Sequence, residues 1–447
     1  MKKNAVKKLE NKCIEEEDKE NNIEFFRGAQ ILQLEAETLR EIEKQSGKKF
    51  KLLNIAELST QIGFSIDNNG SVIYIGIHRS KLTNLPESIG NLTSLHELNI
   101  SNTRLSTLPE SIGSLSLLKK LFLRKNKLAS LPESISNLES LISLSLRDNR
   151  LTILPESMGF LRSLCNLNLS LNHLSMLPES TGNMSSLQIL NLCRNRLVTL
   201  PESIGNLSSL QTLSLDSNYL KYLPESIGGL SSLKMLPMYN NKLTSLPESL
   251  GNLQSLQYLG LANNRLTSLP KTFGALSSLK ELDLNNNRLS NLPESIGGLT
   301  SLRELILSFN QIKNLPESFG TLYSLKKLLL HNNPLRSLPE SFGNLQSLKT
   351  LRLNDTRLKT LPESIGRLSS LKELSLYNNQ LITLPESMGN LESLNFLHLH
   401  CNELSHLPDS IGNLSSLITL SLNNNKLTKL PESKAILESF ENLSDLY

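Results

Sequence analysis

Histidine and cysteine side chains gather most closely in the segment His398-Leu399-His400-Cys401, with His406 a few residues later. Imidazole and thiolate groups are zinc ligands, and His398 and His400 would share one face of a strand. Cys401 follows at an expected bend, however, and the pattern assures no fourth ligand. We therefore interpret these histidines as surface residues, and we expect neither a bound metal nor another cofactor.

Motifs typical of nucleophilic catalysis and of phosphate binding are absent from the sequence. The chain has no Gly-x-Ser-x-Gly nucleophile elbow and no Gly-x-x-x-x-Gly-Lys phosphate loop. Its 46 Lys and Arg against 42 Asp and Glu give a net charge of +4, which is too mild for a nucleic-acid-binding protein with a concentrated basic face. We expect no enzyme activity and no nucleic-acid partner.

The location of the protein is predicted from two further absences. No run approaches 18 uninterrupted apolar residues, and residues 1–20 lack the apolar core of a secretory signal. Four cysteines show no Cys-x-x-Cys pair and no regular spacing, as expected of reduced thiols in a cytosol. We therefore predict a cytoplasmic protein with no membrane insertion.

An internal repeat must position any binding residues. The string Leu-Pro-Glu-Ser, or a close variant, starts at Leu85 and returns every 23 residues to Leu430, in sixteen copies without an insertion. In the copy around Leu282-Asp283-Leu284, both leucines would point to one side of a short strand and Asp283 to the other. No repeat can bury its apolar face alone, so the repeats must stack.

The rest of each repeat predicts how the chain leaves the strand and returns. Asn287 and its equivalents would satisfy backbone groups at the bend, and we expect weaker bends where Ser80, Thr103 and Thr356 replace the asparagine. Proline then starts the return segment, and a glycine two residues after the serine limits it to a single 3-10 or α turn.

The repeating frame L-x-x-L-x-L-x-x-N-x-L-x-x-L-P-E-S-I-G-x-L-x-x resembles the leucine-rich repeat consensus from about Val72 to Phe440. Its LPESIGNL form is similar to the Ras-group repeats of plants and of the animal Shoc2-type scaffolds. The resemblance implies an α/β fold: a right-handed solenoid, curved like a horseshoe, with a parallel sheet on its concave face and short 3-10 or helical turns on its convex face.

The same resemblance implies the kind of partner. Shoc2-type scaffolds bring a phosphatase and a small GTPase together on such a solenoid, so it implies another protein, of one of these two kinds, as the partner. A phosphatase-docking segment has a basic residue before Val/Ile-x-Phe. The match at Ile23-Glu24-Phe25 lacks that basic residue.

The ends of the chain depart from the repeat. We predict a disordered charged tail over residues 1–28 and an amino-terminal cap over 29–71, made of a helix over Ala29 to Gln45 and a hairpin strand turning at Asn69-Gly70. Sixteen strands would follow over 72–433. A carboxy-terminal cap would occupy 434–447, where Asp445 replaces an inward leucine.

Glutamates form a second column along the repeats. The Glu of Leu-Pro-Glu-Ser recurs from Glu87 onward, and basic residues such as Arg104 and Lys127 stand six residues before the next one. We interpret the column as a solvated charge ladder in which the two signs compensate. An acidic docking ridge for a basic partner is the alternative.

Specific recognition should come from outward strand residues, because these vary while the inward ones repeat. They form three groups: two combine aromatic and basic side chains, and the middle one is aromatic and apolar. Exposed aromatic residues with arginine nearby are typical of protein-binding hot spots. The predicted partner-binding residues are Lys120, Phe122, Arg124 and Arg147; Met235, Tyr239, Tyr258 and Phe309; and His331, Arg352, Tyr377 and His398.

We therefore predict a non-catalytic protein-interaction scaffold for intracellular signalling that binds its partner on the concave face. One alternative is a recognition module for glycans or microbial ligands, which would need export. Another is the substrate-selecting part of an effector enzyme, but residues 1–63 and 434–447 are too short for an ordinary catalytic domain.

Overall fold

The computed structural model describes residues 23–54 and 61–428. Contacts within the chain divide it into two compact units, residues 1–196 and residues 197–447, and each is described by itself. The predicted carboxy-terminal cap and the first 22 residues of the predicted tail lie outside the described residues.

The first unit begins with a β-hairpin. Strand β1 (Ile23–Phe26) pairs antiparallel with β2 (Ala29–Leu32), and Arg27 and Gly28 turn between them with φ of 52° and 93°. The predicted disorder over 1–28 is therefore wrong for residues 23–28. Buried and exposed side chains alternate along β2, and this period of two fits a strand better than a helix. The helix therefore begins at Gln33, later than the predicted start at Ala29.

The helix and a second hairpin complete the amino-terminal elements. Helix α2 (Gln33–Ser46) ends at Gly47, whose left-handed backbone donates to the carbonyl of Glu43. Strand β3 (Lys51–Leu52) pairs with β4 (Gly63–Ile66), and β4 pairs antiparallel with β5 (Val72–His78). The carboxylate of Asp67 accepts the N–H groups of Asn69 and Ser71, each at 2.9 Å, so the predicted hairpin turn is confirmed.

Each repeat forms one coil with a strand and a 3-10 helix. In the first unit the remaining strands are β6 (Glu97–Ser101), β7 (Lys120–Phe122), β8 (Ser143–Ser145), β9 (Asn166–Asn168) and β10 (Ile189–Asn191). The 3-10 helices there are η2 (Glu87–Asn91), η3 (Glu110–Ser114), η4 (Glu133–Asn137), η5 (Glu156–Phe160) and η6 (Glu179–Asn183).

The second unit continues the same pattern. Its strands are β11 (Thr212–Ser214), β12 (Met235–Pro237), β13 (Tyr258–Gly260), β14 (Glu281–Asp283), β15 (Glu304–Ile306), β16 (Lys327–Leu329), β17 (Thr350–Arg352), β18 (Glu373–Ser375), β19 (Phe396–His398) and β20 (Thr419–Ser421). Its 3-10 helices are η7 (Glu202–Asn206), η8 (Glu225–Gly229), η9 (Glu248–Asn252), η10 (Lys271–Ala275), η11 (Glu294–Gly298), η12 (Glu317–Thr321), η13 (Glu340–Asn344), η14 (Glu363–Arg367), η15 (Glu386–Asn390) and η16 (Asp409–Asn413).

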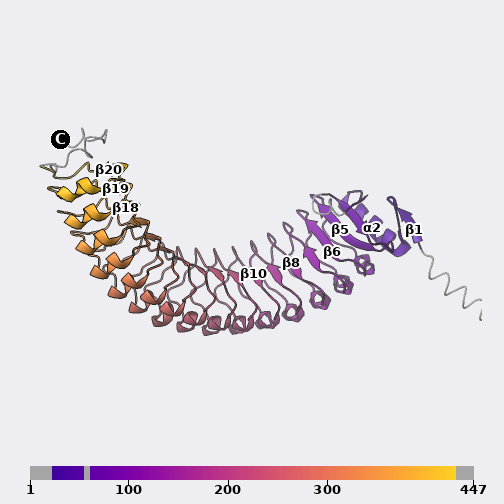
Figure 1. The fold of residues 1–447 in the computed structure, drawn as a ribbon. Helices are drawn as coiled ribbons and strands as arrows, with labels where there is room; N and C mark the ends of the chain where they lie inside the picture. Colours follow the sequence, from indigo (N-terminus) through magenta and orange to yellow (C-terminus); the bar gives the residue numbers. More distant parts are fainter. Residues whose placement is uncertain (1–22, 55–60, 429–447) are drawn as a thin grey trace, which may run out of the picture. The chain divides into compact units, whose positions relative to one another are not determined.

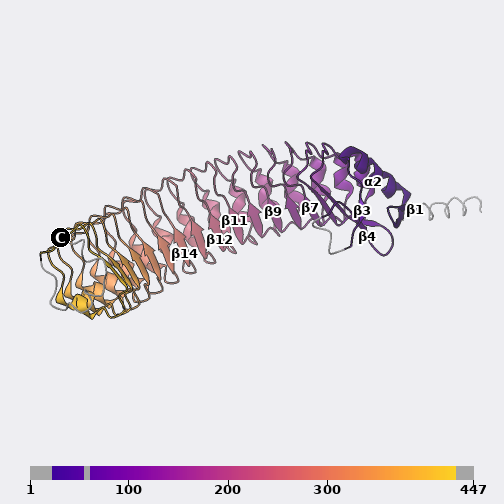
Figure 2. The ribbon, with the colours of Figure 1, turned by 90° about the horizontal axis from the view of Figure 1, so that it is seen from above.

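From β5 onward, neighbouring strands within each unit are parallel and in register, so that Lys327 faces Thr350 and Leu328 faces Leu351. The strands lie on one side of the coils and the 3-10 helices on the other (Figures 1 and 2). Leu282 is 1% exposed and Leu284 is fully buried between the two sides. The predicted leucine-rich-repeat fold, with a parallel sheet on one face and 3-10 turns on the other, is confirmed.

A ladder of asparagine side chains joins each coil to the preceding one. The amide nitrogen of Asn287 donates to the carbonyl of Leu284 in its own coil, at 3.1 Å, and to that of Leu261 in the coil before, at 3.0 Å. Its amide oxygen accepts the N–H of Leu266, also in the coil before, at 3.0 Å. One buried side chain therefore satisfies three backbone groups, which confirms the predicted role of the asparagine.

The residue before each ladder asparagine has a left-handed backbone, which the sequence reasoning missed. Asn286 has a φ of 52°, and its equivalents in the other described coils lie between 49° and 60°. Asparagine and aspartate tolerate this conformation better than other residues with a side chain, and they occupy nine of these sixteen described positions.

Thr356 interrupts the ladder. Its single hydroxyl proton is shared between two acceptors, the carbonyl oxygen of Leu353 at 3.1 Å and the amide oxygen of Asn379. The N–H of Leu335, which an asparagine at 356 would accept, has no hydrogen-bond partner among the described residues. A threonine hydroxyl cannot replace both ends of an amide, so this bend makes fewer bonds, as predicted.

The glutamate column caps the 3-10 helices. The carboxylate of Glu87 accepts the N–H of Ser111 in the next coil at 3.2 Å, and that of Glu110 accepts the N–H of Ser134 at 3.2 Å. Equivalent bonds run from Ser180, Ser226, Ser249, Thr272, Ser387 and Ser410. The sequence predicted that basic side chains compensate these glutamates. In the structure, their carboxylates accept hydrogen bonds from backbone N–H groups instead.

Glu35 is a buried acid between α2 and β5. Its side chain is nearly enclosed, and its two oxygens accept the N–H of Val72 at 3.3 and 3.2 Å. Burial raises the pKa of Glu35 to about 7; Asp67 acts in the same direction, and the bond from Val72 opposes it.

Replacing Thr356 by asparagine is expected to stabilise the second unit. The new amide would accept the N–H of Leu335, and relieving an unsatisfied buried group is worth about 1–3 kcal/mol. Urea unfolding midpoints of the variant and the wild type measure the effect. Thr360→Asn, at an exposed position of the same coil, is the control, and an unchanged midpoint for Thr356→Asn would show that the bond does not form.

Glu35 is expected to make stability depend on pH. Because its folded pKa of about 7 exceeds the ordinary value of 4.5, the folded chain binds this proton more tightly than the unfolded chain does. Its contribution to stability is greatest below pH 4.5 and is lost as the pH rises through 7. Glu35→Gln should therefore flatten the profile from pH 5 to 8 in urea unfolding, whereas Glu37→Gln, exposed on the same helix, should not.

Candidate functional site

The strand face is the set of outward side chains on the strand side of each coil. In the coil of β14 these are Glu281, Asp283 and Asn285, which alternate with the buried Leu282 and Leu284. Eleven of the twelve predicted binding residues occupy equivalent positions. Phe309 is the exception, because it is the left-handed residue before the ladder asparagine Asn310.

The first group lies in the first unit, on the coils of β7 and β8. Lys120 pairs with Glu97 on the neighbouring strand at 3.3 Å, so part of its charge is compensated. Arg124 and Arg147 are exposed on adjacent coils, and Phe122 is half-buried between the two neighbouring strands. The pKa of His78 on β5 is lowered, mainly by burial and further by Arg124 and Arg79, which shows a basic local field.

The second group centres on two tyrosines in the second unit. The rings of Tyr239 and Tyr258 are 6.5 Å apart at an angle of 60°, and their hydroxyls are hydrogen-bonded. The ring of Tyr239 lies over Gly260, where an added Cβ would meet the ring carbon Cζ at 2.5 Å. Met235 is exposed on β12 beside this pair.

Acidic side chains surround the two tyrosines. Asp216 accepts the backbone N–H of Tyr239 at 2.8 Å. The pKa of Tyr258 is raised to about 12, first by burial and then by Asp283, Asp216, Glu281 and Glu304. Sequence reasoning missed these acids because they come from three coils, although the outward columns contain them.

The third group forms a pocket over β17 to β19. Its volume is about 400 Å³, and it is lined by Arg352, Asn354, Glu373, Ser375, Tyr377, His398 and His400. Three predicted residues, Arg352, Tyr377 and His398, therefore meet in one cavity. The guanidinium Nε of Arg352 donates to Glu373 at 2.9 Å, which fixes the orientation of the arginine.

Stacked rings form part of this pocket. Tyr377 and His400 are parallel within 10° with centroids 4.5 Å apart, and His398 meets His400 edge-on at 6.5 Å. The pKa of His400 is lowered, mainly by burial and next by His398, while Asp355 opposes the shift. His331, the remaining predicted residue of this group, lies on the coil of β16 against the edge of Phe309, at 5.5 Å and 83°.

Within residues 23–54 and 61–428, no three His, Cys, Asp or Glu side chains are arranged to hold a metal ion. In the same residues, every helix is too short or too polar to cross a lipid bilayer.

Comparisons with sequence families match most of the array. The profile described as a leucine-rich repeat region matches residues 187–257, 248–333 and 313–446, and the profile of a single leucine-rich repeat matches residues 94–115. No curated protein sequence matches the chain significantly.

Solved structures resemble the chain over most of its length. A leucine-rich repeat protein of Leptospira interrogans is 36% identical, with a TM-score of 0.71, over 88% of this chain and 97% of that one. A TDR receptor is 31% identical, with a TM-score of 0.67, over 81% and 66%. The ectodomain of the Arabidopsis thaliana receptor kinase GASSHO1/SCHENGEN3, in complex with CASPARIAN STRIP INTEGRITY FACTOR 2, is 28% identical, with a TM-score of 0.53, over 89% and 62%.

The acidic surroundings of Tyr258 can be tested by titration. Asp283→Asn removes the largest charge contribution and is expected to lower the pKa of Tyr258 from about 12, while burial keeps it above the ordinary value of 10. The pH dependence of the tyrosine ¹³Cζ resonance measures this pKa. Glu392→Gln, on the side of the 3-10 helices, is the control, and equal pKa values in both variants would contradict the assignment.

Proposed function

Because the chain belongs to the leucine-rich repeat proteins, we propose that it is a non-catalytic scaffold that binds a protein partner on its strand face. Proteins of this fold typically serve as interaction modules. Within the second unit, the pocket over β17 to β19 is the proposed centre of binding.

The single observation that carries this proposal is the convergence of Arg352, Tyr377 and His398 in one pocket. Aromatic and arginine side chains in a partly enclosed site supply most of the energy at protein interfaces. Arg352 is held through Nε by Glu373, and its terminal Nη groups have no partner among the described residues. These groups remain able to bind a partner in a fixed geometry.

Rigid strands support the same conclusion. The backbone at Arg352, Ser375 and His398 is fixed in neighbouring parallel strands, and the ladder asparagine Asn379 bonds to the carbonyls of Leu353 and Leu376 in both coils. A preformed surface loses little conformational entropy when it binds. A similar solved structure, that of GASSHO1/SCHENGEN3, is described as a complex with a named factor, and this favours a protein or peptide partner here.

The finer predictions from the sequence remain predictions. A small GTPase or a phosphatase is the partner implied by resemblance to Ras-group repeats, and the groups around Arg124 and around Tyr239 are further proposed contact surfaces. The cytoplasmic location is also a prediction, because one similar structure is described as an ectodomain. Fractionation of cells producing the tagged protein tests the location.

Removing the pocket side chains is expected to release the partner. Affinity purification with quantitative mass spectrometry should find proteins that co-purify with the wild type and with Tyr323→Ala, but are depleted with Arg352→Ala/Tyr377→Ala. Tyr323 is a matched control, because it is 57% exposed but follows η12, away from the strand face.

The purified partner allows a quantitative test. Titration calorimetry should show that Tyr377→Ala weakens binding by more than about 1 kcal/mol, with thermal unfolding nearly unchanged. A partner that binds the double variant as tightly as the wild type would place the interaction elsewhere on the chain.

A further inference from the structure

We infer a second binding site in the second unit: a trough beside β15 to β17 that takes a short extended peptide segment with one apolar and one acidic side chain. It lies next to the strand face rather than on it. The inference rests on the proposed function only in taking the partner to be a protein.

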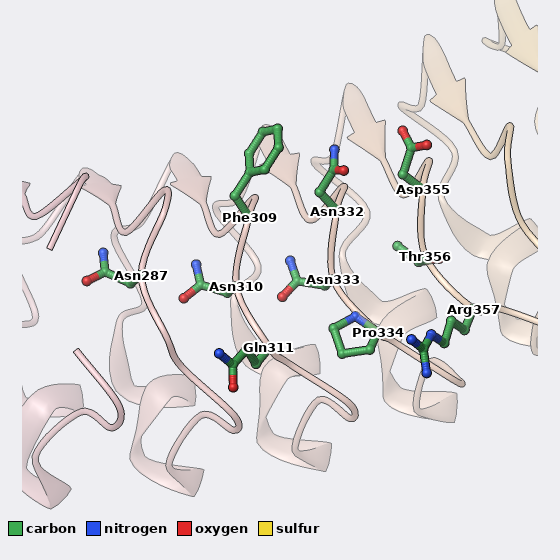
Figure 3. A pocket seen from close by; sticks show the side chains of 10 residues that line it. All are labelled: Asn287, Phe309, Asn310, Gln311, Asn332, Asn333, Pro334, Asp355, Thr356 and Arg357. Atoms are coloured by element: carbon green, nitrogen blue, oxygen red, sulfur yellow. The ribbon is translucent and has the colours of Figure 1, made fainter. Parts of the chain in front are cut away.

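The trough has a volume of about 500 Å³. Figure 3 shows its side chains in three rows that run across successive coils. Ladder asparagines and Thr356 form the middle row. Phe309, Asn332 and Asp355 stand along one side, and Gln311, Pro334 and Arg357 along the other.

Phe309 is the first of three departures from the repeat that meet at this trough. It has a φ of 54°, and it is the only aromatic residue among the left-handed positions of the described coils. A bulky side chain is strained in this conformation. Its ring is 50% exposed, so burial in the core does not offset the strain.

Pro334 is the second departure. In the neighbouring coils, the residue at this position donates its N–H to the coil before, as Gln311 does to Leu289 at 2.9 Å and Arg357 does to Leu335 at 3.0 Å. Proline has no N–H. The carbonyl of the buried Ile312 consequently lacks the donor that its equivalents have.

Thr356 is the third departure, since it leaves the N–H of the buried Leu335 without a partner in the described part of the chain. Ile312 and Leu335 occupy the same position in adjacent coils, so the two lost bonds are neighbours. Strain and lost bonds of this kind persist where function requires the residues concerned. Three departures in three successive coils, all lining one trough, therefore mark a binding site.

The unpaired groups of the trough indicate what it binds. The side-chain amides of Gln311 and Asn332 and the guanidinium of Arg357 have no partner among the described residues. Amides pair with the N–H and C=O groups of an extended peptide, and Arg357 suits a carboxylate. The carboxylate of Asp355 is already held by the amides of Asn354 and Asn378, at 2.7 and 2.5 Å, so Arg357 is the free charge.

The coil spacing sets the length of the segment. Phe309 and Arg357 are two coils apart, which is about 10 Å along the stack at the usual strand spacing. They also stand on opposite sides of the trough, so the segment must cross it as well. An extended residue covers about 3.3 Å. The apolar side chain that contacts Phe309 and the acidic one that binds Arg357 should therefore be at least three residues apart in the peptide.

A library of random octapeptides displayed on phage, selected on the immobilised full-length protein, tests the proposal. Enriched peptides are expected to carry an apolar and an acidic residue at least three positions apart. Their synthetic, end-blocked forms should bind in fluorescence anisotropy, with affinity reduced at least fivefold by Phe309→Asn and by Arg357→Glu. Replacing the acidic residue of the peptide by lysine should restore binding to Arg357→Glu.

Two controls make the outcome decisive. Phe309→Asn should raise the unfolding midpoint, because asparagine suits the left-handed backbone, so its loss of binding cannot come from misfolding. Arg352→Ala/Tyr377→Ala should leave the peptides bound.

Peptides that bind Phe309→Asn and Arg357→Glu as tightly as the wild type, or no enrichment at all, would overturn the trough site. If these peptides instead lose binding to Arg352→Ala/Tyr377→Ala, the strand-face function stands without the trough. If glycans on an array depend on Phe309 and Arg357 while no peptide does, the trough is a glycan site and the peptide proposal fails.

Discussion

One asparagine amide per coil is the interaction on which the rest of the structure depends. At Asn287 the amide nitrogen donates to the carbonyls of Leu284 and Leu261, and the amide oxygen accepts the N–H of Leu266. The bend at the end of each strand would otherwise leave these buried groups without partners, each at a cost of about 1–3 kcal/mol. Within each unit the same bonds recur at intervals of 23 residues wherever the asparagine is present, so these coils are held to the ones before in the same way and the strands stay in register.

Different residues hold the coils together and face the solvent, and this leaves the strand face available for recognition. Inward leucines and ladder asparagines hold the coils, so outward residues such as Arg352 and Tyr377 can vary without loss of the fold. The exceptions are informative. Where Phe309, Pro334 and Thr356 depart from the pattern, the structure loses favourable backbone geometry or hydrogen bonds, and the same residues border one trough.

Periodicity was enough to predict most of the fold. The alternation around Leu282 and Leu284, the role of Asn287 and the turn at Asn69-Gly70 each follow from local chemistry and are confirmed. The strand at Ile23–Phe26 was missed because charged and apolar residues mix there without a clear period. The acids around Tyr258 and the rings around Tyr377 could be placed in columns, but not in contact, because contact depends on side-chain directions that spacing does not fix.

Residues bonded between neighbouring coils are separated by a constant number of positions, and this constancy determines how the chain can gain or lose repeats. Every ladder bond joins residues a fixed number of positions apart, so excising residues 281–303 would bring Lys280 next to Glu304, at an equivalent point of the following coil. Each new junction would find the same partners as the old one. Genetic duplication or loss of whole 23-residue modules could thus lengthen or shorten the recognition surface in steps of about 4.8 Å, while the remaining modules kept their structure.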